Sequence, residues 1–349
     1  MTPNGQINFL LEGGQIISHN RAEDLSANIG SSMGINDDLD NQDAVLSELY
    51  YSHTFNTSQK PENQFILTLG KIDQACFFDA NEIANCGNSQ FLATPLDNNM
   101  AIPFPDKGLG ANLLLNLSEN FYITTGMGDN HADARESGFT TISDGDFFYA
   151  TELGFIKTHN RTGNYRLMVW HNQTITNDGN GIAISIDQHI TDNLVLFTRW
   201  GMGDQAITDV QQFFSAGVGI VSPFGREEDL SGIGIAWANP SDDAIGEETI
   251  FEMFYRYQLN NLMHITPSLQ AVIDPANATE SDTVYVFSLR LQTTWQNVLP
   301  NGSLQLKRYG LHLAMHQRHA PGSVAAISCS NVDRDPTQNS CNKALVDRQ

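Results

Sequence analysis

The feature that most limits the fold is a period-two alternation of apolar and polar residues near the end of the chain. In the segment 249–259, Phe251, Met253 and Tyr255 lie on one face, and Glu252 and Arg256 lie on the other. Alternation of this kind predicts a strand with one apolar face. Strands in soluble proteins are usually about five to six residues long, so segments of about ten residues favour tilted strands that cross a bilayer.

The same unit recurs along most of the chain. It predicts fourteen strands, at about 7–16, 45–55, 63–73, 109–117, 120–128, 147–156, 163–171, 181–190, 193–202, 213–222, 230–238, 249–259, 263–273 and 283–295. The connections between them alternate between mostly longer and mostly shorter ones, as in up-and-down barrels with long external loops and short periplasmic turns. We therefore predict an all-β fold, a transmembrane antiparallel up-and-down β-barrel.

Charge excludes several kinds of partner. The chain has 40 acidic residues against 18 Lys and Arg, a formal net charge of −22. This balance argues against nucleic acid as a partner, since its phosphates require basic patches, and it disfavours docking onto anionic lipid as a peripheral protein. The first residues, 1–4, carry no signal peptide, although a protein bound for an outer membrane needs one, so we expect an N-terminally truncated chain. Cys76 and Cys86 can close a small disulfide loop in an oxidising compartment, and the sequence leaves this open.

Enzyme motifs are poorly supported. Residues 30–34 match the G-x-S-x-G pattern, but an acidic loop follows them where a nucleophile elbow needs a helix. The sequence contains no P-loop, no dinucleotide fingerprint behind a strand and no HExxH motif. We therefore predict no enzymatic activity, no cofactor and no metal.

Residues 74–108 break the alternation. This stretch combines many polar residues with Phe77, Phe78, Phe91 and Phe104, and it is too apolar for a disordered loop. Loops of this length are usually functional. We expect it to fold against the barrel or into the pore.

Several motifs resemble the OprB family of carbohydrate-selective porins. They are Gly70-Lys71-Ile72-Asp73, Phe77-Phe78-Asp79-Ala80-Asn81-Glu82, Ser89-Gln90-Phe91-Leu92, Asn98-Asn99, Ala101-Ile102-Pro103-Phe104-Pro105, and the segments 232–242, 248–259, 265–275 and 284–295. The resemblance covers residues 1–295. It implies a sixteen-strand barrel in the bacterial outer membrane, through which mono- and disaccharides diffuse passively, and hence two absent N-terminal strands. Trp295 supplies the aromatic residue on which such barrels commonly end.

Residues 296–349 are different material. They hold six Lys and Arg against three acidic residues, the reverse of the rest of the chain. We expect this stretch to be a tail outside the barrel.

Sugars present hydroxyl edges and apolar ring faces, so a sugar pore needs fixed polar side chains and aromatic surfaces. The predicted pore residues are Asp79, Asn81, Glu82, Gln90 and Phe91 in the long loop, and Asn112, Asn116, Arg166, Trp170, Glu252, Arg256, Arg290 and Gln292 on the wall. Arg and Glu inside a barrel can equally cross-link its wall. The expected partners are small sugars and outer-membrane lipid, and the sequence leaves open a homo-oligomer. The alternatives are a general, non-selective porin and a soluble β-rich binding or adhesion protein.

Overall fold

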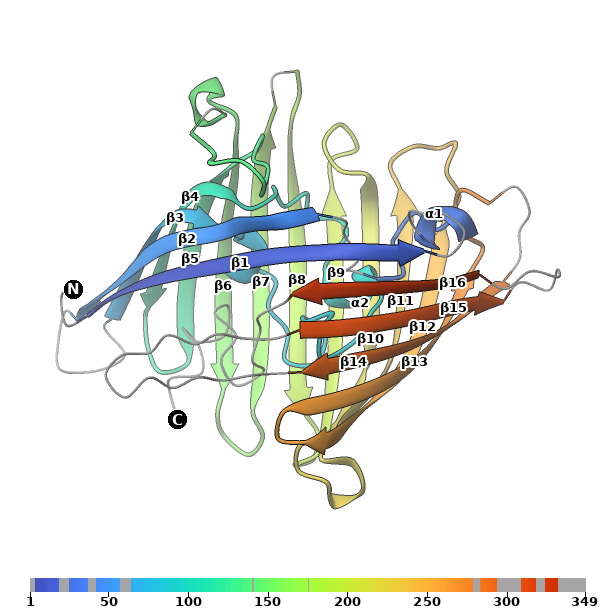
Figure 1. Ribbon diagram of the computed structural model, residues 1–349. Coiled ribbons are helices and arrows are strands. Elements are labelled where there is room, and N and C mark those ends of the chain that lie inside the picture. The colour runs from blue at the N-terminus through green and yellow to red at the C-terminus, as the bar shows by residue number, and fades with distance from the viewer. Residues whose placement is uncertain are drawn as a thin grey trace.

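The computed structural model is a closed antiparallel β-barrel (Figure 1). It describes residues 4–18, 25–36, 42–56, 64–139, 141–174, 176–278, 283–293, 309–317 and 324–331. Within these ranges sixteen strands pair in chain order, and β1 closes the ring by pairing with β16. Closure leaves no sheet edge, which a barrel in lipid requires because unpaired backbone groups find no water there.

The strands are long and the helices short. The strands are β1 (Gly5–Ser18), β2 (Gln42–Asn56), β3 (Gln64–Ile72), β4 (Gly108–Asn116), β5 (Phe121–Asp129), β6 (Phe147–Lys157), β7 (Gly163–Gln173), β8 (Asp178–His189), β9 (Leu194–Gly203), β10 (Val210–Val221), β11 (Leu230–Pro240), β12 (Glu248–Asn260), β13 (Met263–Ile273), β14 (Thr283–Thr293), β15 (Tyr309–Gln317) and β16 (Val324–Asn331). The helical turns are α1 (Leu25–Ile29), η2 (Gln74–Cys76), α2 (Thr94–Asp97), η3 (Ile142–Asp144) and η4 (Pro223–Gly225). In the described part of the chain, none of the helices has the length and apolar character needed to cross a membrane.

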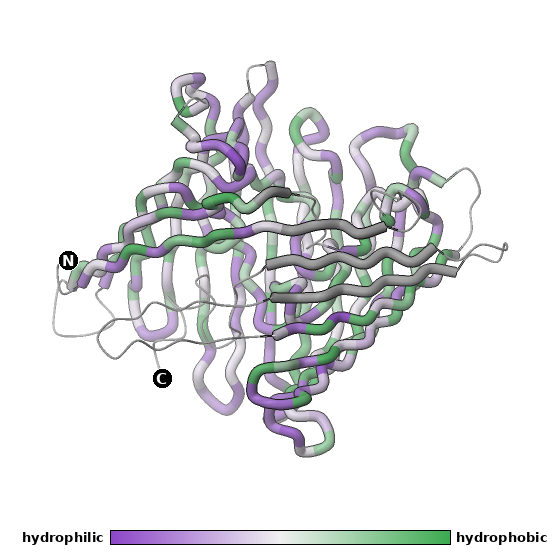
Figure 2. The backbone as a smooth tube through the Cα atoms, viewed as in Figure 1, coloured by the Kyte–Doolittle hydropathy of each residue, from purple (hydrophilic) through white to green (hydrophobic). Residues whose placement is uncertain are grey.

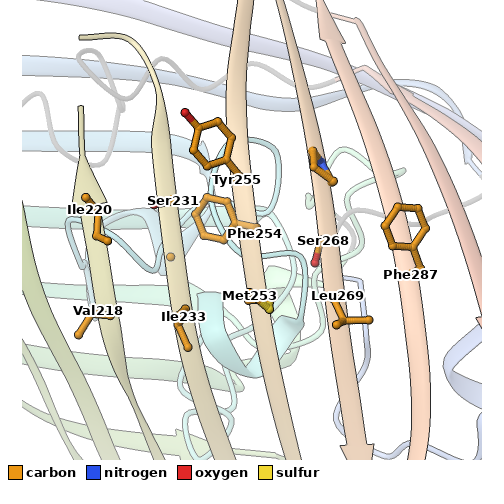
Figure 3. Close-up of a pocket in the computed structure, with 12 residues that line it drawn as sticks. Val218, Ile220, Ser231, Ile233, Met253, Phe254, Tyr255, Ser268, Leu269 and Phe287 are labelled. Carbon is orange, nitrogen blue, oxygen red and sulfur yellow. The ribbon is translucent and has the colours of Figure 1, made fainter. Parts of the chain in front are cut away.

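All fourteen predicted strands are present, as β1 to β14. Along them hydrophobic and hydrophilic residues alternate (Figure 2). Met253 and Phe287 are exposed on the outer face, whereas Glu252 and Ser268 are buried on the inner face. The outer face also carries an apolar groove over β10 to β14, lined by side chains such as Ile220 and Leu269 (Figure 3). The wall therefore has an apolar outer surface suited to lipid.

The expectation for residues 296–349 was wrong in part. Strands β15 and β16 lie in this stretch, where β15 pairs with β14 and β16 pairs with β15 and β1. The register joins Leu289 to Leu313 and Ile17 to Ile327. The alternation is present in this stretch too, where Leu311, Leu313 and Met315 are separated by His312 and Ala314. Trp295 lies outside the described residues. The two strands that bring the count to sixteen are β15 and β16, so the count gives no ground for two absent N-terminal strands.

The interior of the barrel is packed rather than open along most of the wall. Residues 73–107, which connect β3 to β4, lie inside the ring together with α2 (Figure 1). Residues 25–35, which lie between β1 and β2, also pack inside the barrel. Their side chains Ile29 and Met33 belong to the same buried cluster as Phe91 and Leu96. A hydrophobic core thus forms inside the barrel, from loop residues against the inner face of the wall.

Candidate functional site: the loop inside the barrel

Residues 73–107 will be called the inner loop. Its side chains Phe78, Phe91 and Leu96 are fully buried, and Phe77 and Phe104 are partly buried. The Phe91 ring packs edge-on against Phe254, with ring centroids 4.9 Å apart, and lies 5.5 Å from the Phe197 ring. Burial of a phenylalanine side chain contributes about 1.5–3 kcal/mol, so several such contacts hold the inner loop to the wall.

Glycines on three neighbouring strands make room for these side chains. A Cβ atom on Gly219 would lie 2.4 Å from Ile83 Cγ2, and one on Gly234 would lie 2.8 Å from Leu96 Cδ2. A Cβ atom on Gly201 would meet the Asn99 amide at 2.4 Å. We call Gly201, Gly219, Gly232 and Gly234 the glycine floor. Glycine inside a strand weakens it, and it commonly marks a close approach of another segment, which here is the inner loop.

Buried polar groups on the wall hold the backbone of the inner loop. The Glu252 carboxylate, fully buried on β12, accepts hydrogen bonds from Leu92 N at 2.9 Å and Ala93 N at 2.8 Å, and from Ser268 Oγ at 2.7 Å. The Arg290 guanidinium donates to Gly87 O and, at 2.9 Å, to Gln90 O. Hydrogen bonds to charged groups contribute about 1.5–3 kcal/mol each, so these two side chains are strong anchors.

A third anchor is an ion pair without access to water. Arg199 Nε lies 2.8 Å from Asp79 Oδ2, and the two side chains are 0% and 5% exposed. The same guanidinium donates to Asp79 O at 2.9 Å and to Leu96 O at 3.3 Å. Removing one member of such a pair leaves the other charge buried without a partner, which lowers the free energy of unfolding by about 3–5 kcal/mol.

Next to this pair, further charged groups line the contact between loop and wall. Glu152 Oε2 accepts a hydrogen bond from Asp79 N at 3.0 Å, and Tyr122 donates its hydroxyl to Glu152 Oε1 at 2.8 Å. Arg166 Nη1 lies 2.7 Å from Asp187 Oδ2, again with both side chains buried. The wall therefore offers the loop fixed charges of both signs in a region of low dielectric constant.

Burial raises the pKa of Asp79 to about 6, against the opposing effect of the Arg199 guanidinium, while the neighbouring Glu152 carboxylate raises it further. Arg166 also faces this carboxyl and lowers its pKa. A pKa raised in the folded state adds stability that is fully present below the ordinary value of 3.8 and is lost as pH rises through about 6. The inner loop is thus most firmly held at acidic pH.

The corresponding experiment is limited proteolysis of the detergent-solubilised barrel at several pH values. Cleavage within the inner loop is expected to become faster as pH rises from about 4 to about 7, reflecting a loss on the order of 3 kcal/mol. The Asp79→Asn variant lacks this carboxyl, so its cleavage rate is expected to rise less over that window, with the remaining response due to the other buried carboxyl groups, Glu152 and Glu252. An equal pH response in both proteins would contradict the role given to Asp79.

The structure brings most of the predicted pore residues together, but at the buried contact between loop and wall. Asp79, Asn81, Gln90, Phe91, Arg166, Trp170, Glu252, Arg256, Arg290 and Gln292 are all buried. Glu82 is the exception within the loop, because its side chain is 37% exposed and pairs with His189 Nε2 at 2.8 Å. Asn112 and Asn116 are buried on β4. The contacts support an anchoring role, and direct contact with a solute stays a prediction.

Sequence reasoning missed Arg199, Glu152 and Asp187, and it missed the glycine floor. Each of these residues lies within a predicted strand at an inward position, so the alternation contained the signal. It also missed that Ser32 N donates to Glu248 Oε2 at 2.8 Å and that Gln270 Nε2 donates to Ile35 O at 2.9 Å. Residues 25–35 are therefore tied to the wall as well.

The disulfide left open by the sequence is not formed. Cys76 and Cys86 are both buried, and they are not bonded to each other. Cys86 N instead donates to Asp97 Oδ1 at 3.2 Å, within the inner loop.

Solved porin structures have the same barrel fold as this chain. The structure of OprB from Pseudomonas putida at high pH superposes with a TM-score of 0.63 at 15% identity, covering 88% of this chain and 79% of that one. The structure of OccK10 (OpdN) from Pseudomonas aeruginosa gives a TM-score of 0.54 at 8% identity, covering 95% and 99%. At such identities these likenesses establish the barrel fold.

In sequence, an uncharacterised protein of Aquifex aeolicus is 28% identical over 222 residues, covering 64% of this chain and 62% of the relative. Porin AaxA of Chlamydia abortus is 23% identical over 283 residues, covering 78% and 62%. The chain thus spans about 62% of the length of these relatives.

The closed barrel with its apolar outer face has the fold of outer-membrane porins, and over part of its length the chain is similar to porins in sequence. This fold and these similarities point to a channel rather than to an enzyme. Residues 173–295 match the family described as carbohydrate-selective porin, OprB family, which confirms the resemblance seen in the sequence.

Proposed function

We propose that the protein is a passive diffusion channel for small carbohydrates, of the size of mono- and disaccharides. The observation that carries this proposal is the inner loop, which is packed against the inner wall of a barrel that matches a carbohydrate-selective porin family. A loop anchored at this depth narrows the lumen and sets an upper limit on solute size.

The inner face is covered more completely at β7 to β14 than at the ends of β1 to β3. The inward side chains of β7 to β14 are mostly buried, whereas Asn8 on β1, Ser52 and Thr54 on β2, and Gln64 on β3 are partly exposed on the inner face. Ser52 Oγ lies 2.8 Å from Thr68 Oγ1 of the neighbouring strand. We assign the passage to this side. Its hydroxyl and amide groups exchange hydrogen bonds with sugar hydroxyls, and its lack of charge agrees with weak binding and rapid exit.

Liposome swelling with sugars of graded size tests the proposal. The purified, folded chain is expected to admit mono- and disaccharides and to exclude much larger oligosaccharides. Ser52→Trp is expected to slow disaccharide entry several-fold, because the indole fills the proposed passage. Thr151→Trp is the matched control, since Thr151 is exposed on the outer face of β6.

Two outcomes would contradict the proposal. Equal entry of sugars and of charged solutes of the same size would indicate a general porin without sugar preference. No swelling with a barrel that is folded, as shown by heat-modifiable gel mobility, would exclude a channel.

A further inference from the structure

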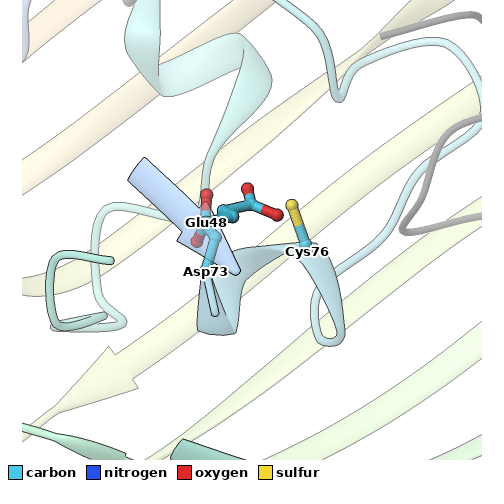
Figure 4. Close-up of side chains that lie close together, drawn as sticks. All are labelled: Glu48, Asp73 and Cys76. Atoms are coloured by element: carbon cyan, nitrogen blue, oxygen red, sulfur yellow. The ribbon is translucent and has the colours of Figure 1, made fainter. Parts of the chain in front are cut away.

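Three side chains with metal-binding atoms converge where the inner loop begins (Figure 4). They are Glu48 from β2, Asp73 just after β3, and Cys76 in η2. One carboxylate oxygen of each acid and the Cys76 Sγ atom all lie within 4.8 Å of one another. None of these residues belongs to the loop and wall anchors described above.

The backbone explains why these three groups meet. The pairing of β2 with β3 reaches Leu49 and Lys71, so Glu48 and Asp73 come just beyond the end of the ladder. A register shift in the pairing of β1 with β2 leaves Ser47 as an extra residue, and Ser47 and Glu48 are both buried. Glu48 faces the interior in the same alternation as Tyr50 and Ser52, and the β-bulge turns Ser47 to the interior beside it. Asp73 Oδ1 accepts a hydrogen bond from Ala75 N at 3.0 Å, which fixes its carboxylate at the start of η2.

Burial makes the arrangement informative. The Glu48 and Cys76 residues are only 5% and 3% exposed, so two of the three donors are removed from bulk water. If all three groups are ionised, the two carboxylates and the thiolate repel one another at this separation. A bound divalent cation reverses this relation, because it favours the deprotonated form of each ligand.

The donor set selects among cations. One sulfur and two carboxylate oxygens suit zinc, which accepts Cys, Asp and Glu ligands in a four-coordinate arrangement. Magnesium and calcium prefer oxygen ligands alone. We propose that Glu48, Asp73 and Cys76 bind one zinc ion, with the fourth position open to water or another small ligand. Binding releases the thiol proton to solvent.

The position of this zinc cluster gives it a structural consequence. Cys76 and Asp73 belong to the first residues of the inner loop, whereas Glu48 belongs to the wall. Zinc therefore clamps the entrance of the inner loop to β2. Zinc binding is expected to slow proteolysis of the inner loop. This expectation does not depend on whether sugars pass through the barrel.

The test uses the full chain, folded in detergent, stripped with a chelator and then titrated with zinc against a chromogenic indicator. One zinc per chain is expected, and cadmium should give the ultraviolet charge-transfer absorption of a thiolate ligand. Cys76→Ser and the isosteric Glu48→Gln are expected to weaken zinc binding by at least roughly tenfold. Cys86→Ser is the matched control, because Cys86 is a buried cysteine of the same loop outside the cluster.

The outcomes separate cleanly. Stoichiometric binding that survives Cys86→Ser and is lost in Cys76→Ser and Glu48→Gln supports the site. Absence of stoichiometric zinc, or equal binding by wild type and Glu48→Gln, would overturn it. Heat-modifiable mobility verifies folding of each variant, and the cadmium absorption of the Cys86→Ser protein gives a reading that does not depend on the stability of Cys76→Ser.

Discussion

Replacing Gly219 and Gly234 together by valine is expected to expel the inner loop from the wall and to raise single-channel conductance several-fold. A Cβ at Gly219 would lie 2.4 Å from Ile83 Cγ2, and one at Gly234 would lie 2.8 Å from Leu96 Cδ2, so the Ile83 and Leu96 side chains must leave their present places on the wall. Valine favours strands more than glycine does, so the barrel itself is not weakened by intrinsic propensity. Sugars larger than disaccharides should then enter liposomes.

Gly246→Val is the control for this experiment. Gly246 lies in the connection between β11 and β12, and a Cβ there meets nothing within 4 Å. The control is expected to show wild-type conductance. Unchanged conductance in a folded Gly219→Val and Gly234→Val double variant would show that the glycine floor does not position the loop.

The second large effect is expected at Arg199. The Arg199→Met variant keeps much of the side-chain volume but, at pH well above 6 where the Asp79 carboxyl is ionised, leaves that carboxylate buried without its cation. The free energy of unfolding should fall by about 3–5 kcal/mol, as measured by denaturant titration in detergent. Adding Asp79→Asn removes the uncompensated charge, so the double variant should regain a large part of that loss.

Arg161→Met provides the comparison with an exposed ion pair. Arg161 pairs with Asp192 at the surface, where the two side chains are 40% and 86% exposed. Such pairs contribute little, so this variant should unfold as the wild type does. Equal destabilisation by Arg199→Met and Arg161→Met would contradict the importance of the buried pair.

The architecture of the wall could be predicted because the alternation of side chains is local. Each of the strands β1 to β14 shows it within its own residues, as Phe251 to Leu259 do. The apolar composition of residues 74–108 likewise predicted a folded loop. The strands β15 and β16 were not predicted, because residues 296–349 were interpreted from their basic composition as a tail. The alternation of Leu311, Leu313 and Met315 with His312 and Ala314 indicates a strand there.

The contacts of the site could not be predicted in the same way. Alternation assigns Glu252 and Arg290 to the inner face, but it does not distinguish a side chain that lines water from one that binds a loop. That distinction depends on where Leu92 and Gln90 come to lie, which is set by packing across more than a hundred residues of sequence. The role of Gly219 and Gly234 could not be predicted for the same reason. They make room for Ile83 and Leu96, and these contacts are known only from the folded structure.

The measurement that tests the central claim most directly is a cross-link between loop and wall. In a chain whose native cysteines are serines, Ile83→Cys and Gly219→Cys place two thiols where the Ile83 side chain now meets Gly219, within the range of a disulfide. The disulfide is expected to form in the folded barrel, whereas Ile83→Cys with Gly246→Cys should not form one. A folded barrel in which Ile83→Cys and Gly219→Cys stay reduced under oxidising conditions would show that the inner loop does not lie against the wall.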